Sequence, residues 1–391
     1  MKIPISRNWF GAEEFEAIQV PLREGWVVQG RQVKAFEQSF SKFTGAEVSL
    51  ACSSGTAALQ IACVALGTKP GDEVVVPAFT WVATPNVIEL LGAKAVFCDI
   101  DLDTFNVDTS MLSAYLNERT VGLIPVHLFG LCAEIDPVLS LAKAKNLWVV
   151  EDAACALGAW YRDRHAGTIG DAGCFSFHPR KSITTGEGGM VTVDNDELAR
   201  LLDGLRNHGA VPASKSGMGN TGHTSLLPSY SVAGFNYRLT DIQAALGVAQ
   251  MHRLEWLLAE RQRCAAYYAE SLADVEWLRI PTPPTHQRHA WQSYVTLFAP
   301  EQPQLKNVGK LHEQRNNLMK YLETRGVSTR QGTHAPAHLD YYVQKYGYRP
   351  QDFPNAYLAD RLSLALPLYP GMTEAELEQV STQLKTYHPK G

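Results

Sequence analysis

The chain has 391 residues, of which 45% are hydrophobic and 19% charged, the composition of an ordinary globular protein with a large core. This length suggests two domains. The formal net charge of −5 argues against a broad nucleic-acid-binding surface, and no apolar stretch reaches the roughly 18 residues that a membrane span needs.

The cysteines indicate the compartment. The seven cysteines are an odd number, form no CxxC pair, and several lie in apolar strand-like runs. Reduced, buried cysteines of this kind are typical of a cytoplasmic protein. Residues 1–15 lack the apolar run of a secretion signal, and no spacing typical of metal ligands occurs, so we expect neither secretion nor a metal.

Strand-like and helix-like segments alternate over about the first 250 residues. The strand-like runs are Glu47–Cys52, Glu73–Val76, Ala95–Cys98, Val121–Val126, Leu147–Glu151, Cys174–Phe177 and Met190–Val193. Helical patterns between them cover Thr56–Leu66, Ala83–Leu91 and Ile135–Ala144. This alternation predicts an α/β fold with a mainly parallel central sheet and helices on both faces. Ligands of such sheets bind at the carboxyl ends of the strands.

A second region has a different pattern. Helices are predicted over Leu239–Leu258, Ala259–Leu272, Leu311–Arg325 and Thr373–Tyr387, and strands over Val275–Ile280, Gln292–Phe298 and Val327–Arg330. We therefore expect a large domain over 1–255 and a smaller C-terminal α+β domain over 256–391, joined by a long helix. Ala213–Tyr230 has no period and reads as a long loop, either functional or a plain surface excursion.

Two segments carry candidate chemistry. Lys181 lies between an aromatic strand-like run and a glycine-rich loop, in small and apolar surroundings unlike those of a surface lysine. Asp152 closes an apolar strand, where it could also cap a helix, and Glu151 alternates to the opposite face. Pyridoxal 5′-phosphate needs such a pair, because the amine forms a Schiff base and the carboxylate keeps the pyridine nitrogen protonated.

A phosphate site is predicted nearby. Residues 51–59 read as a strand, a turn of small residues and the start of a helix, whose backbone amides can bind a dianionic phosphate. Gly55 lets the backbone approach a ligand, and Thr56 and Ser176 add hydroxyl groups. An ordinary helix cap explains the Ser-Gly-Thr turn equally well.

The Ser-Phe-His-x-x-Lys…Gly-Glu-Gly-Gly block is highly specific, and nearly the whole chain around it resembles the DegT/DnrJ/EryC1/StrS sugar aminotransferases. The resemblance implies the fold type I architecture of pyridoxal-phosphate transferases, with Lys181 as the cofactor lysine and Asp152 as the partner of the pyridine nitrogen. It excludes the dehydratase branch, which carries His in place of this lysine.

The resemblance implies further roles. Trp81 would stack on the cofactor ring. Cys155 stands where the family often has Gln as a donor to the phenolate oxygen; a thiol donates weakly, so the role of Cys155 stays open. Asn236 would reach the phosphate of a neighbouring subunit, which implies a homodimer with shared active sites. Arg238 would bind a carboxylate or a phosphate, or form an ion pair with Asp241.

The expected reaction follows from the same resemblance. L-glutamate, or glutamine, would donate an amino group to a nucleotide-linked keto-sugar by ping-pong transfer, with His178 and His334 as candidate substrate contacts. Amination of an inosose-type ketone and an aminohydroxybenzoate-type synthase are enzymatic alternatives. A non-catalytic sensor is the alternative of another class, and it would have no need of the assembled cofactor residues.

Overall fold

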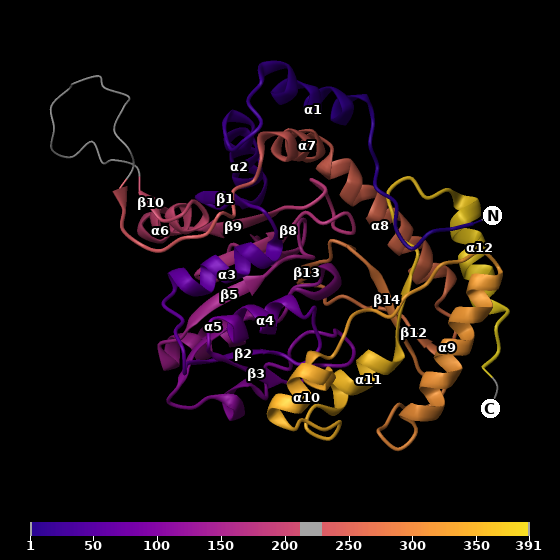
Figure 1. Cartoon of the computed structure of the whole chain (residues 1–391). Coiled ribbons are helices and arrows are strands. Elements are labelled where there is room, and N and C mark those ends of the chain that lie inside the picture. Colours follow the sequence, from indigo (N-terminus) through magenta and orange to yellow (C-terminus); the bar gives the residue numbers. More distant parts are fainter. Residues whose placement is uncertain (1, 212–228, 390–391) are drawn as a thin grey trace, which may run out of the picture.

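The computed structural model describes residues 2–211 and 229–389. A seven-stranded sheet, in the order β1-β9-β8-β5-β4-β2-β3, forms its centre (Figure 1). Its strands are β1 (Val48–Cys52), β2 (Glu73–Pro77), β3 (Lys94–Cys98), β4 (Thr120–Leu123), β5 (Trp148–Asp152), β8 (Ala172–Ser176) and β9 (Gly189–Val193). β9 runs antiparallel to both of its neighbours, and the other pairings are parallel. The predicted mainly parallel sheet is confirmed.

Both faces of this sheet are covered. Its helices are α1 (Ala12–Glu24), α2 (Arg31–Thr44), α3 (Gly55–Ala65), α4 (Ala83–Leu90), α5 (Ile135–Lys145), α6 (Asp196–Arg206) and α7 (Asp241–His252), with short turns η1 (Leu112–Tyr115) and η2 (Leu128–Gly130). Successive side chains of β2 point to opposite faces. Val74 and Val76 pack into the core on the α3 side, and Val75 packs with α5 on the other. A strand buried on both faces is therefore apolar at consecutive positions.

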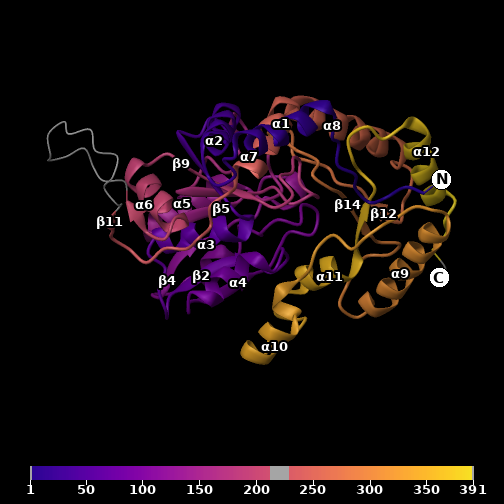
Figure 2. The same ribbon diagram turned by 45° about the horizontal axis from the view of Figure 1, so that its top comes forward.

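A second, three-stranded sheet lies in the C-terminal part (Figures 1 and 2). It consists of β12 (Leu278–Arg279), β14 (Tyr294–Phe298) and β15 (Ser363–Leu366). The helices of this part are α8 (Leu254–Ser271), α9 (Val308–Thr324), α10 (Asp340–Tyr346), α11 (Pro354–Leu362) and α12 (Glu374–Lys385), with the turn η3 (Pro336–His338). Short pairs complete the structure: β6 (Trp160–Tyr161), β7 (Arg164–His165) and β13 (Gln287–Arg288), and β10 (Ala210–Val211) with β11 (Ser229–Tyr230).

Two details differ from the predicted elements. The helix expected over Leu239–Leu258 breaks at Arg253, where α7 ends and α8 begins. Val327–Arg330 is not a strand, because Val327 bridges only to Ile3 and Arg330 only to Ala365. The predicted loop Ala213–Tyr230 lies outside the described residues except for its end in β11. The domain boundary near residue 255 stays a prediction.

The cysteines fall into two groups. All are free, and six of them are buried. Burial raises the pKa of Cys52, Cys63 and Cys98 to about 12 and that of Cys264 to about 11. Cys155 is the half-buried one. The expectation of unpaired cysteines therefore holds at all seven positions, and the expectation of burial holds at every position except Cys155.

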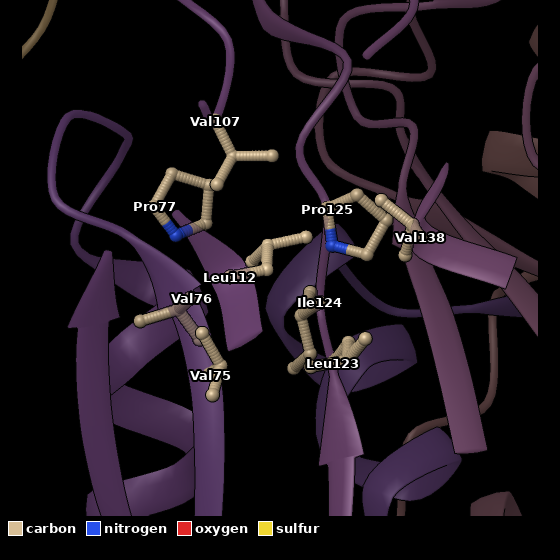
Figure 3. A pocket seen from close by; sticks show the side chains of 9 residues that line it. All are labelled: Val75, Val76, Pro77, Val107, Leu112, Leu123, Ile124, Pro125 and Val138. Carbon is tan, nitrogen blue, oxygen red and sulfur yellow. The ribbon is translucent and has the colours of Figure 1, made fainter. Parts of the chain in front are cut away.

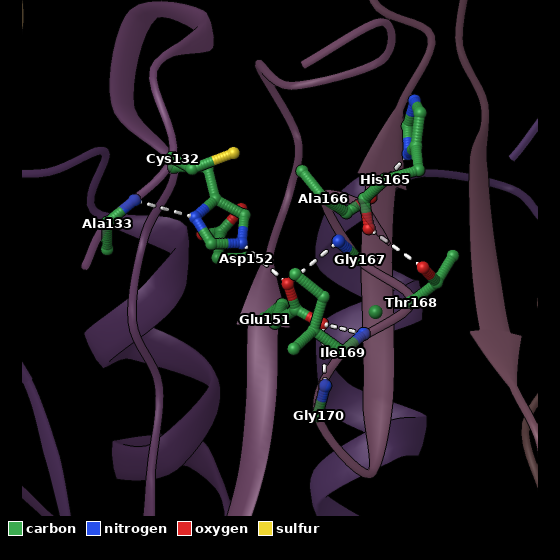
Figure 4. A network of polar contacts seen from close by, with 12 residues as sticks. Cys132, Ala133, Glu151, Asp152, His165, Ala166, Gly167, Thr168, Ile169 and Gly170 are labelled. Carbon is green, nitrogen blue, oxygen red and sulfur yellow. Dashed lines mark hydrogen bonds and ion pairs between the residues drawn. The ribbon is translucent and has the colours of Figure 1, made fainter. Parts of the chain in front are cut away.

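A buried carboxylate fixes the end of β5. Glu151 accepts hydrogen bonds from the backbone amides of Gly167 (2.8 Å), Ile169 (2.6 Å) and Gly170 (2.7 Å), as Figure 4 shows. A further donor is Nε2 of His127, at 2.7 Å. Burial alone would raise the pKa of Glu151, but these donors outweigh it and hold the pKa below the usual 4.5. The strand end is thus tied to the loop before β8.

Replacing this carboxylate tests its contribution to stability. Glu151→Gln should lower the free energy of unfolding by about 3 kcal/mol, because its amide group would face N–H donors in a buried site. The lowered pKa of Glu151 means that its contribution is present above pH 4.5 and is lost as the pH falls through the folded-state value. Urea unfolding at several pH values should show a smaller acid dependence in the variant. Glu118→Gln at an exposed position is the control, and equal acid dependence in wild type and Glu151→Gln would contradict this account.

Candidate active site

Lys181 is held in the loop that follows β8. Its backbone N–H donates to the carbonyl of His178 (2.8 Å), and its own carbonyl accepts from Nη2 of Arg261 (3.2 Å). The half-buried side chain places Nζ 3.1 Å from Sγ of Cys155. The structure therefore places Lys181, the predicted cofactor lysine, next to Cys155, the residue that stands where the family often has Gln.

Asp152 ends β5, the neighbour of β8 in the sheet. It is 5% exposed, and its Oδ2 accepts a 2.6 Å hydrogen bond from Thr84 Oγ1. Residues 153–159 form turns and no helix, so the alternative that Asp152 caps a helix is wrong. Oδ1 of Asp152 accepts from the backbone amide of Ala154 at 3.2 Å. A carboxylate has about four acceptor sites, so two donors leave capacity for the N–H group of a ligand.

The predicted phosphate turn forms the start of α3. Ser54 caps this helix, its side chain accepting from the amide of Ala57 at 3.0 Å. The amides of the first helical residues, Gly55 and Thr56, have no acceptor within the helix. A Cβ at Gly55 would lie 2.8 Å from Cβ of Ser176, so only glycine allows β8 and the helix to approach this closely. The turn and the Ser176 hydroxyl form a cradle that fits a phosphate.

Trp81 lies beside this assembly. Its side chain is 53% exposed, which a core tryptophan would not be. The backbone amide of Thr80 donates to the carbonyl of His334 (3.0 Å), and the rings of Trp81 and His334 have centroids 6.0 Å apart. Thr80 Oγ1 lies 3.4 Å from that of Thr84, the residue bonded to Asp152. Trp81, His334 and Asp152 thus belong to one region.

The Asn236–Arg238 segment borders the phosphate turn of the same chain. The carbonyl of Tyr237 accepts from the amide of Ser53 at 2.8 Å, and Arg238 donates to Oδ1 of Asn207 at 2.7 Å. Asp241 is not the partner of Arg238, because it accepts from backbone amides at the start of α2. The side chain of Asn236 is exposed.

His178 is held locally. Its Nδ1 accepts a 3.2 Å hydrogen bond from the amide of Arg180, so its other ring nitrogen carries the proton in the neutral form. Burial and the positive charges of Arg180 and Lys181 lower its pKa, against the opposite effect of Glu187. The neutral imidazole of His178 is compatible with both roles that the sequence left open, a structural role and a contact to the substrate.

Sequence reasoning missed two supporting residues. Thr84 orients Asp152, and the buried Arg261 binds the carbonyls of Lys181 (3.2 Å) and Gln292 (3.1 Å). Burial lowers the pKa of Arg261 to about 10. An arginine on a helix ordinarily faces solvent, so no signal in the sequence distinguishes this one.

Other candidate sites are weaker. An apolar gap between β2 and β4 has a volume of about 10 Å³, less than a water molecule needs, and no polar side chain lines it (Figure 3). It is lined by Val75, Val76, Pro77, Val107, Leu112, Leu123, Ile124, Pro125 and Val138. Within 2–211 and 229–389, no group of three or more His, Cys, Asp or Glu residues could hold a metal, and no helix is long and apolar enough to cross a membrane.

Several known proteins are similar to this chain in sequence and in fold. The spore coat polysaccharide biosynthesis protein SpsC of Bacillus subtilis is 36% identical over 379 residues, 97% of this chain and 95% of that protein. The solved structure of the putative sugar aminotransferase Spr1654 of Streptococcus pneumoniae, in its PLP form, has a TM-score of 0.88 and 28% identity, covering 99% of this chain and 98% of the other. DesV of S. venezuelae, solved with a ketimine intermediate, has a TM-score of 0.87 and 28% identity, with 98% of both chains covered.

The family model of the DegT/DnrJ/EryC1/StrS aminotransferases matches residues 9–385. Spr1654 has been solved in a PLP form and in a PMP form, and the amine, carboxylate and phosphate cradle described above fit this cofactor. The chain therefore belongs to the DegT/DnrJ/EryC1/StrS aminotransferase family and is a pyridoxal-phosphate-dependent aminotransferase.

Proposed function

We propose that this aminotransferase moves the amino group of L-glutamate to the ketone of a nucleotide-linked sugar. The observation that carries the proposal is the common edge of the sheet at which three groups lie: the Lys181 loop follows β8, Asp152 ends the neighbouring β5, and the open start of α3 packs against Ser176 at the end of β8. The names of two relatives support a sugar as acceptor, since one takes part in spore coat polysaccharide biosynthesis and another is a putative sugar aminotransferase.

Each residue has a proposed role. The amides of Gly55 and Thr56 and the hydroxyl of Ser176 bind the phosphate, Trp81 stacks on the ring, and Asp152 accepts a hydrogen bond from the pyridine nitrogen. Bound pyridoxal phosphate supplies an electron sink and a temporary carrier of the amino group. Lys181 holds the cofactor between turnovers and, once released, moves the proton at its Nζ in both half-reactions.

We also propose that the enzyme is a homodimer with shared active sites. Large apolar side chains of α1 and the segment after it are exposed: Phe15 (60%), Leu22 (57%), Trp26 (57%) and Val28 (54%). Clusters of this kind mark protein interfaces. Burial of this surface by a second copy would bring the exposed Asn236 to the partner's phosphate site, as the family resemblance implies.

The donor half-reaction tests the function directly. The protein loaded with cofactor should be yellow, and L-glutamate should bleach the colour while 2-oxoglutarate is released. A nucleotide keto-sugar should then restore the colour and yield an amino sugar. Lys181→Ala should lose at least about 10³-fold in turnover with an unchanged melting temperature. Lys143→Ala, at an exposed lysine, is the control. Normal turnover by Lys181→Ala would refute the role of this lysine, and a wild type indifferent to glutamate would refute the donor.

Cys155 should set the acidity of the nitrogen that joins Lys181 to the cofactor. Glutamine in its place would donate a stronger hydrogen bond to the neighbouring phenolate oxygen. The phenolate would then attract the proton on that nitrogen less, so Cys155→Gln should lower the pH midpoint of the visible band. Titration of the absorbance of wild type, Cys155→Gln and Cys155→Ala measures this midpoint. An unchanged midpoint in Cys155→Gln would assign Cys155 a purely structural role.

Shared sites predict complementation between inactive variants. Lys181→Ala and Asn236→Ala proteins should each be weak alone, because one lacks the amine and the other a phosphate ligand for its partner. Refolding them together at equal amounts should restore about a quarter of wild-type activity, since half of the dimers are mixed and each mixed dimer has one intact site. Mixtures no more active than their parents would place Asn236 and Lys181 in the same subunit's site.

A further inference from the structure

Thr84 connects two residues of the candidate cofactor site. It lies in the first turn of α4, and its backbone amide donates to the carbonyl of Trp81 at 3.3 Å. Its hydroxyl donates to Oδ2 of Asp152 at 2.6 Å, although the two residues are 68 positions apart along the chain. One residue therefore contacts both the tryptophan proposed to stack on the cofactor ring and the carboxylate proposed to bind the ring nitrogen.

The surroundings of the Thr84 hydroxyl strengthen its bond to Asp152. Thr84 and Thr80 are fully buried and Asp152 is 5% exposed, so little water competes for these groups. A hydroxyl has one proton, and that of Thr84 is given to Asp152, so Thr84 can only accept from the hydroxyl of Thr80, 3.4 Å away. The direction of both hydrogen bonds is thereby fixed, from Thr80 to Thr84 and from Thr84 to Asp152.

The two donors of Asp152 also distinguish its two oxygens. Oδ2 accepts the short bond from Thr84, whereas Oδ1 accepts a longer bond of 3.2 Å from the amide of Ala154. The last torsion of an aspartate side chain is broad when nothing restrains it. A donor on each oxygen fixes this torsion and leaves Oδ1, the more weakly bonded oxygen, with the greater capacity for the N–H group of a ligand.

We propose that Thr84 is a positioning residue for the cofactor ring, an inference that rests on the proposed role of Asp152. Its hydroxyl holds the carboxylate so that Oδ1 meets the pyridine nitrogen, and its amide holds the backbone of Trp81 beside the ring. Both bonds come from one turn of α4, so the nitrogen partner and the stacking partner keep a fixed spacing. Thr84 does not touch the reacting atoms and takes no part in proton transfer.

Two forms of the cofactor test this inference. In 1-deaza-pyridoxal phosphate a C–H group replaces the ring nitrogen, while the aldehyde and the phosphate are unchanged. Absorbance titration of the full-length protein freed of cofactor gives the Kd of each form, and the ratio of the deaza Kd to the natural Kd measures the contribution of the nitrogen. Thr84→Val should lower this ratio about 10-fold, through weaker binding of the natural form. A general loss of stability would weaken both forms alike and leave the ratio unchanged.

Matched variants control for the loss of a buried hydroxyl. Thr84→Ala should give the same ratio as Thr84→Val, and Thr84→Ser, which keeps the donor, should retain the wild-type ratio. Thr296→Val should also retain it, because the hydroxyl of this fully buried threonine donates to the carbonyl of Leu364 in the small sheet. A wild-type ratio in both Thr84→Val and Thr84→Ala would overturn the inference, as would a Thr84→Ser ratio as low as that of Thr84→Val.

Asp152→Asn separates this inference from the proposed role on which it rests. This variant should lower the ratio at least as far as Thr84→Val does. A ratio lowered by Asp152→Asn and unchanged by Thr84→Val and Thr84→Ala would keep the role of Asp152 and refute that of Thr84. A ratio unchanged in Asp152→Asn would refute the proposed contact of Asp152 with the nitrogen, and the inference with it.

Discussion

The end of β5 is the constraint on which the site depends. Glu151 and Asp152 are adjacent, and their side chains leave the strand on opposite sides. Glu151 accepts hydrogen bonds from His127 and from the backbone amides of Gly167, Ile169 and Gly170, so it has little acceptor capacity left for a ligand. Asp152 has one side-chain donor, Thr84, and retains capacity for a ligand. At the end of β5, Glu151 thus holds the backbone in place and Asp152 remains able to bind a ligand.

The glycine at the start of α3 has a comparable role. Contact between Gly55 and Ser176 sets how near the helix comes to β8, and therefore how near a phosphate on the helix amides lies to the Lys181 loop. On the far side of that loop, Arg261 reaches from α8 to the carbonyls of Lys181 and Gln292. The loop is thus fixed between the large sheet and the approach to the small one. The backbone of Lys181 is therefore fixed, and its amine can move mainly through the torsions of its own side chain.

The sequence predicts the large sheet well because each of its strands is a short apolar run between turn residues. Lys181, Asp152 and Gly55 are recognisable since each lies at a strand end or a helix start, where the order of the elements fixes its position. The C-terminal part is harder. Val327–Arg330 has the composition of a strand and makes only isolated bridges to Ile3 and Ala365, the first of which is more than 300 residues away along the chain. Local pattern cannot report such contacts.

Other features also depend on tertiary contacts. At the break between α7 and α8, the side chain of Arg253 forms ion pairs with Glu13 and Glu14 of α1, and nothing in the helical pattern of residues 239–258 marks the break. The same holds for the contact of Cys155 with Lys181, which joins residues 26 positions apart. Arg261 resembles any surface arginine until the fold buries it.

The distribution of the cysteines has a chemical consequence. Six thiols are buried, and a buried thiol with a raised pKa presents almost no thiolate to solvent. Cys155 is half-buried and next to the amine that must remain free to act. Electrophiles and oxidants should therefore modify the enzyme first at this position, and occupancy of the cofactor site should shield it. The rate at which thiol reagents modify the protein should therefore depend mainly on Cys155 and on whether the cofactor is bound.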